Sequence, residues 1–101
     1  MTWEEKLAAC KSLGDCALRM RKPGDWYVSW NVETVEQGHP GMLAGRYGNG
    51  ASPQLAVEDH WAKITASDVV ALVTDATRST RREVRWNGFM WWDVVSSEQP
   101  A

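Results

Sequence analysis

Few side chains in this sequence could support catalysis or hold a metal ion. The histidines are His39, in a Gly/Pro-rich loop, and His60, on the apolar stripe of a predicted helix. With Cys10 and Cys16 they make up a zinc-ligand set, but no two of the four have the spacing of a known zinc site. We therefore expect His60 to be a hydrogen-bonded boundary residue, the two cysteines to be small core residues, and neither a metal nor a cofactor to be bound.

Other catalytic patterns are also missing from the sequence. Glu58 and Asp59 are adjacent, and neighbouring helical positions diverge by about 100°, so their carboxylates would not converge on one substrate. Ser-His-Asp patterns are absent, and Gly48-Asn49-Gly50 is too short for a phosphate-binding loop and lacks a following lysine. The sequence predicts a protein without catalytic activity.

The composition is that of a small folded domain with an excess of tryptophan. The 101 residues include seven tryptophans, 44% are hydrophobic and 24% are charged, and the net charge is −2. No apolar run approaches the ~20 residues of a membrane-spanning helix, and residues 1–5 lack the features of a secretory signal. We expect a single cytoplasmic domain over residues 1–101, with a frayed tail from about residue 96 and no membrane association.

The apolar pattern predicts an α+β domain with one antiparallel sheet packed against two helices, in the order α-β-β-β-α-β-β-β. The first helix, over about residues 3–13, follows a capping box of Thr2 and Glu5. The second runs from the N-cap Ser52 and Pro53 to about Thr65. Strands are predicted over 16–21, 26–33 and 42–47, the last ended by the Gly48–Gly50 segment, while 69–74 is either strand or helix. A C-terminal hairpin surrounds Asn87-Gly88.

That hairpin sets which side chains share a face. Asn-Gly predicts a two-residue type I′ turn. The resulting cross-strand pairs are Trp86 with Phe89, Arg85 with Met90, Val84 with Trp91, Glu83 with Trp92, and Arg82 with Asp93. Because paired residues share a face, the first and third pairs should lie in the core, and the last pair should close that face as a partly exposed ion pair.

The opposite hairpin face combines large apolar groups with opposite charges, which is typical of a surface that binds another protein. The expected contact residues are Trp92, Met90, Arg85 and Glu83, with Tyr27 on the outer face of the second strand as a further candidate. The same face could join two copies of the chain, or Arg85 could instead cover Trp92 by a cation–π contact. The other six tryptophans fall on inner faces and should fill the core rather than line a ligand pocket: Trp3, Trp26, Trp30, Trp61, Trp86 and Trp91.

Two basic clusters make nucleic-acid or nucleotide binding the alternative function. One cluster, Arg19, Arg21 and Lys22, lies on and beside the first strand; the other leads into the hairpin and comprises Arg78, Arg81, Arg82 and Arg85. Beside Trp86 and Trp92, the second cluster could bind a single strand by stacking and charge. Glu83 and Asp93 dilute it, so we interpret it instead as a solvent-exposed strand edge.

The segment Tyr47-Gly48-Asn49-Gly50-Ala51-Ser52, followed by a helix with Ala56 on its inner face, resembles the double-stranded-RNA-binding domain. The resemblance covers about residues 3–64 and implies that family's α-β-β-β-α topology. The family holds phosphates with lysines at the start of the second helix. This chain has Glu58 and Asp59 there and no lysine, so the resemblance does not extend to RNA binding.

The stretch Val84-Arg85-Trp86-Asn87-Gly88-Phe89-Met90-Trp91 resembles small accessory proteins of tailed bacteriophages and prophages. That resemblance implies a host-takeover or anti-defence protein that occludes a host protein in the bacterial cytoplasm. We therefore expect a non-enzymatic protein-binding module whose partner is a host protein or a second copy of itself.

Overall fold

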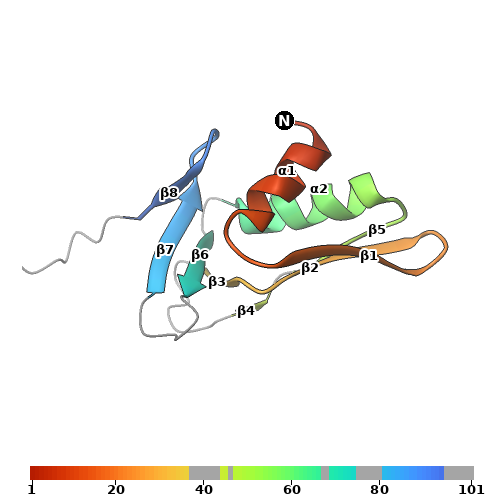
Figure 1. Cartoon of the computed structure of the whole chain (residues 1–101), viewed down its shortest axis with the longest axis horizontal. Coiled ribbons are helices and arrows are strands. Elements are labelled where there is room, and N and C mark those ends of the chain that lie inside the picture. The colour runs from red at the N-terminus through yellow and green to blue at the C-terminus, as the bar shows by residue number, and fades with distance from the viewer. Residues whose placement is uncertain (37–43, 46, 67–68, 75–80, 95–101) are drawn as a thin grey trace, which may run out of the picture.

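The computed structural model describes residues 1–36, 44–45, 47–66, 69–74 and 81–94, and Figure 1 shows how they are arranged. The described residues form two helices and antiparallel strands, which confirms the predicted α+β class, and the order of the elements roughly matches the predicted one. The elements are α1 (Trp3–Lys11), β1 (Cys16–Lys22), β2 (Asp25–Trp30), β3 (Glu33–Glu36), β4 (Ala44–Gly45), β5 (Gly48–Gly50), α2 (Pro53–Ile64), β6 (Val69–Thr74), β7 (Arg81–Trp86) and β8 (Trp91–Asp93).

The described strands form two antiparallel sheets instead of the single sheet expected. One has the order β1-β2-β5 and the other β4-β3-β6-β7-β8. Figure 1 shows α1 and α2 on the same side of the three-stranded sheet, with β6, β7 and β8 standing at one end of it. The predicted strand over 26–33 divides after Trp30, and β3 then pairs with β6. Val32 is buried, as Val28 and Trp30 are, so the apolar alternation continues past the end of β2. The period of two alone therefore does not show that the chain passes from one sheet to the other after Trp30.

Local signals account for both helices. The Thr2 hydroxyl accepts the Glu5 backbone N–H at 3.2 Å, and the Glu5 carboxylate accepts the Thr2 N–H at 2.8 Å, which completes the predicted capping box. The Ser52 hydroxyl likewise accepts from the Leu55 backbone at the start of α2. Helix α1 ends at Lys11, two residues before the predicted end, while α2 ends at Ile64 as expected.

The glycine segment predicted to end the third strand is itself strand β5, which pairs with β2. A Cβ atom on Gly48 would overlap the carbonyl oxygen of Ala56, and one on Gly50 would lie 2.5 Å from the Ala56 nitrogen. The glycines therefore let β5 lie directly against α2. Of the predicted strand over 42–47, the structure describes Ala44–Gly45 as β4; positions 42, 43 and 46, and the loop that carries His39, are outside the described residues.

The main core cluster contains residues from both helices and both sheets: Cys10, Trp30, Val32, Trp61, Ile64, Ala71 and Val84. A second cluster, formed by Val28, Ala56 and Val57, lies between α2 and the three-stranded sheet. The ambiguous segment 69–74 is strand β6, with four buried positions at its start. The six tryptophans predicted to face inward are all buried or packed against these clusters, which confirms that interpretation. Neither described helix has the length and apolar character needed to cross a membrane.

Candidate protein-binding site

The β7–β8 hairpin is fixed to the rest of the protein by two tryptophans. Trp86 and Trp91 lie opposite each other in the strand register, and their ring centroids are 5.4 Å apart. Trp61 of α2 makes edge contacts with both rings, at 4.9 and 5.9 Å, and Trp30 stacks on Trp91 at 6.0 Å. The Trp91 indole N–H also donates to the Ala9 carbonyl of α1 at 2.9 Å. The strand pair next to the hairpin loop is therefore held by both helices and by β2.

The hairpin turn is longer than the predicted two-residue turn. Because Trp86 pairs with Trp91 and Arg85 with Trp92, the four residues from Asn87 to Met90 form the loop. The Asn87 Oδ1 accepts the backbone N–H groups of Phe89 at 2.9 Å and Met90 at 3.0 Å, and the Asn87 N–H donates to the Met90 carbonyl at 3.1 Å. Gly88 takes the left-handed conformation, with φ +104°. The asparagine side chain thus replaces the cross-strand hydrogen bonds of the shorter turn.

This register corrects the predicted position of Phe89. The side chain was expected in the core opposite Trp86, but it is 91% exposed. Met90 is 53% exposed and Trp92 58% exposed. We call Phe89, Met90 and Trp92 the apolar tip of the hairpin. Sequence reasoning missed Phe89 because the two-residue turn placed it within a strand.

Charged residues flank the apolar tip. Arg85 is opposite Trp92 and partly buried, and its Nε has no hydrogen-bond partner among the described residues. The structure describes both side chains and shows no cation–π contact between them; the described arginine over an aromatic ring is Arg21, 4.2 Å from the ring centroid of Tyr27. Glu83 is exposed.

The predicted ion pair between Arg82 and Asp93 is present. Arg82 Nε lies 2.9 Å from Asp93 Oδ1, and both side chains are more than half exposed. In the observed register Asp93 is opposite Val84, so the arginine reaches it diagonally across the strands. An exposed pair of this kind contributes well under 1 kcal/mol, and by strand alternation it lies on the hairpin face of Trp86 and Trp91, opposite the face of Trp92.

Tyr27 does not belong to the hairpin site. It lies on β2 in the three-stranded sheet, where it pairs with Arg19 and Asn49 of the neighbouring strands. The guanidinium that covers its ring also donates to the Asn49 Oδ1 at 3.0 Å. The structure therefore separates this candidate from the other four predicted contact residues.

The four arginines of the nucleic-acid alternative are only partly described. Arg78 is outside the described residues, and for Arg81 the structure describes the backbone alone. The guanidinium of Arg82 is held by Asp93 and that of Arg85 is partly buried. Of this basic cluster, the structure therefore describes the side chains of Arg82 and Arg85 alone.

The acids at the position where double-stranded-RNA-binding domains carry lysines are engaged within the protein. Lys6 Nζ lies 2.6 Å from a Glu58 carboxylate oxygen, and Lys63 Nζ lies 3.0 Å from Asp59 Oδ2. The Asn49 backbone N–H donates to the same Asp59 oxygen and, with Lys63, lowers the pKa of that carboxyl. Both carboxylates are therefore paired with lysines of this chain.

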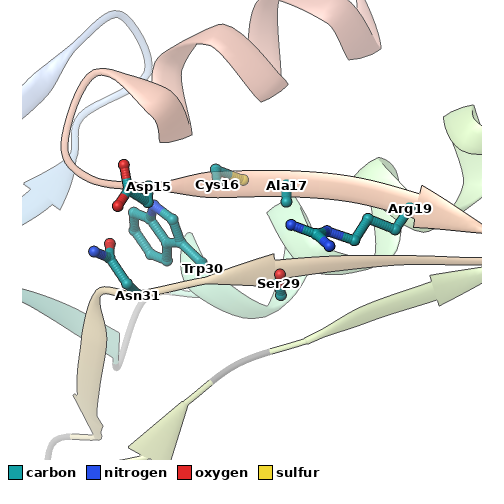
Figure 2. Close-up of a pocket in the computed structure, with 7 residues that line it drawn as sticks. All are labelled: Asp15, Cys16, Ala17, Arg19, Ser29, Trp30 and Asn31. Atoms are coloured by element: carbon teal, nitrogen blue, oxygen red, sulfur yellow. The ribbon is translucent and has the colours of Figure 1, made fainter.

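A hollow of about 350 Å³ lies beside β1 and β2, and sequence reasoning did not anticipate it. Figure 2 shows the Arg19 side chain reaching back along β1 toward Trp30, with Asp15 and Asn31 at the other end. The hollow is open to solvent, and its lining includes one acidic side chain, Asp15, and one basic side chain, Arg19. It is lined by Asp15, Cys16, Ala17, Arg19, Ser29, Trp30 and Asn31.

Of the four residues considered as zinc ligands, the structure shows a contact between Cys10 and His60. Cys10 Sγ lies 3.8 Å from His60 Nδ1, and Cys16 packs against the same core cluster. His60 is fully buried, so it is not the boundary residue expected, and its Nε2 has no hydrogen-bond partner among the described residues. Burial lowers the pKa of His60 to about 4, helped by the positive charge of Lys63. The described residues contain no His, Cys, Asp and Glu cluster able to hold a metal ion.

No protein-family model, curated protein or solved structure matches this chain. The functional inference therefore depends on the geometry of the chain itself. In that geometry the apolar tip presents large exposed side chains next to a strand pair that is packed against the core.

Proposed function

We propose that the protein is a non-enzymatic binding module that holds another protein through the apolar tip of its β7–β8 hairpin. The observation that carries this proposal is the 91% exposure of Phe89 beside the exposed side chains of Met90 and Trp92. Grouped exposed apolar side chains are typical of interaction surfaces. Burying one of them fully in a partner would contribute about 1.5–3 kcal/mol.

The rigidity of the hairpin supports the same proposal. Asn87 holds the backbone of Phe89 and Met90, while Trp91 is bonded to α1 and packed among other tryptophans. A surface held in one conformation before binding loses less conformational entropy when the complex forms. The apolar tip can therefore act as a preformed anchor.

The charged neighbours favour protein over nucleic acid as the partner. On the face of Trp92 the charged rim consists of Arg85 and Glu83, while Arg82 and Asp93 pair on the opposite face of the same strands. Such a rim can make polar contacts with a protein, whereas its carboxylate repels phosphate groups. With the resemblance to phage and prophage accessory proteins, the proposed partner is a host protein in the bacterial cytoplasm that the hairpin occludes.

A second copy of the chain is the alternative partner. Strand β8 is at the edge of the described five-stranded sheet, and Trp92 is exposed on it. An edge strand has unpaired backbone groups that can pair with the same strand of another molecule around a two-fold axis. This arrangement would bury Trp92 between the two copies.

The experiment compares the wild type with Phe89→Ala and Trp92→Ala in crosslinked capture from host extract and in native mass spectrometry. Leu55→Ala is the matched control, because Leu55 is an exposed apolar residue on α2. We expect both tip variants to lose the captured protein or the dimer, and the control to retain it. Equal capture by the wild type and the tip variants, at equal melting temperatures, would overturn the proposal.

A further inference from the structure

Cys10 and Cys16 come from different elements but meet inside the core. Cys10 is the only fully buried residue of α1, with 1% of its surface exposed, and Cys16 is the first residue of β1. Cys16 lies opposite Trp30 in the β1–β2 register, and it packs against the core cluster to which Cys10 belongs. The Trp30 indole N–H donates to the Cys10 carbonyl at 3.0 Å and helps to hold the end of α1 in place.

The surroundings of the two sulfur atoms differ. Cys10 has the imidazole of His60 on its other side, with 3.8 Å between Sγ and Nδ1. Cys16 is only partly buried and is among the residues that line the open hollow beside β1 and β2 (Figure 2). One thiol is therefore enclosed by the core, while the other lies next to a solvent-filled depression.

We propose that Cys10 and Cys16 form a dithiol modification site, which small disulfides such as glutathione disulfide oxidise to an intramolecular disulfide, with Cys16 reacting first. The site is independent of the apolar tip, and it is not a metal centre. Its product would link the end of α1 to the start of β1 across residues 11–15.

The electrostatics of the pair identify the attacking sulfur. The hydrogen bond from Cys10 lowers the pKa of the Cys16 thiol, and the positive charge of Lys11 acts in the same direction. The same bond, together with burial, raises the pKa of Cys10. The thiolate is the nucleophile in disulfide exchange. Cys16 is therefore the sulfur that attacks glutathione disulfide, while Cys10 stays protonated during this first step.

The exchange takes place in two balanced steps. The Cys16 thiolate attacks one sulfur of glutathione disulfide; the new sulfur–sulfur bond forms as the old one breaks, and one glutathione leaves as a thiolate that takes a proton from water. The Cys10 sulfur then attacks the Cys16 sulfur, its proton passes to the second departing glutathione thiolate, and the protein disulfide is complete. Two protein thiols are oxidised, and one glutathione disulfide is reduced to two glutathiones.

The second step is intramolecular, because Cys16 packs against the core cluster to which Cys10 belongs. An intramolecular thiol has a high effective concentration at its target. The mixed disulfide should therefore be short-lived in the wild type.

The test treats the folded full-length chain with glutathione disulfide and follows intact mass and alkylation of free thiols. We expect the wild type to lose two hydrogen masses, with no glutathione retained and Cys10 joined to Cys16 in the peptide map. Cys10→Ser should keep one glutathione on Cys16. Cys16→Ser should react at Cys10 at least about tenfold more slowly.

Contrary outcomes are equally distinct. A wild type that retains glutathione on either cysteine, or stays reduced under conditions that modify the urea-unfolded chain, would overturn the proposal. Faster reaction at Cys10 than at Cys16 would also overturn it. If a serine variant does not fold, the wild-type mass and peptide map decide the question alone.

Discussion

Trp91 and Trp92 are adjacent on β8 and have opposite environments. The Trp91 indole donates to the Ala9 carbonyl and packs among the core tryptophans, while Trp92 is 58% exposed on the other face of the strand. One residue therefore fixes the hairpin to the protein, and its neighbour is presented to solvent. This division of roles allows a surface substitution to be separated from a structural one.

Trp92→Ala should change the free energy of unfolding by no more than about 0.5 kcal/mol, because the side chain makes little contact with the core. Trp91→Ala should cost about 3 kcal/mol, since it removes a packed ring and leaves the Ala9 carbonyl without its donor. Urea denaturation of both variants measures the difference. Similar losses in the two variants would show that Trp92 is part of the core and would remove it from the proposed site.

Asn87→Ala should loosen the hairpin turn. The substitution removes the acceptor of the Phe89 and Met90 backbone N–H groups, at a cost of about 1–2 kcal/mol. Hydrogen exchange at these two amides should become faster. Asn87→Asp is the matched control, because it keeps an oxygen acceptor at the same position and should retain slow exchange. Unchanged exchange in Asn87→Ala would contradict the turn described above.

Gly48→Ala should cost about 1–3 kcal/mol, because the new methyl group overlaps the backbone of α2 at Ala56. The comparison is Gly24→Ala, where no atom lies within 4 Å but φ is +78°. That change should cost about 1 kcal/mol from backbone strain alone. Thermal unfolding should therefore rank Gly48→Ala as the less stable variant, and the reverse ranking would argue against close packing of β5 on α2.

His60 should make the protein less stable in acid. Its pKa is lowered to about 4 in the folded state, from an ordinary value of 6.5. Between these values the unfolded chain binds more protons than the folded one, so stability falls as the pH drops from about 6.5 toward 4. The loss from this group is roughly 3 kcal/mol over that range.

The measurement is the free energy of unfolding at several pH values, for the wild type and for His60→Asn. The variant cannot take up the proton, so its stability should depend less on pH between 6.5 and 4. His39 is present in both proteins and cancels in the comparison. Parallel pH profiles would show that His60 is not the group responsible.

Features whose hydrogen bonds close within a few residues could be predicted from the sequence. The capping box of Thr2 and Glu5 and the N-cap at Ser52 are each complete within one helical turn. Alternation along β2 likewise placed Trp26, Val28 and Trp30 on the inner face, because side-chain direction in a strand follows a period of two. The exposed side of β8 followed from the same rule: a register change of two residues left Trp92 on its predicted face.

The division of the strands into two sheets, the length of the hairpin turn and the neighbours of Cys10 depend on tertiary packing. Four tryptophans from four different elements pack together in the core: Trp30, Trp61, Trp86 and Trp91. In the β7–β8 register that pairs Trp86 with Trp91, Phe89 lies in the loop and not in the core. Cys10, Cys16 and His60 similarly come from α1, β1 and α2. Such contacts form between segments distant along the chain, so no local spacing in the sequence reveals them.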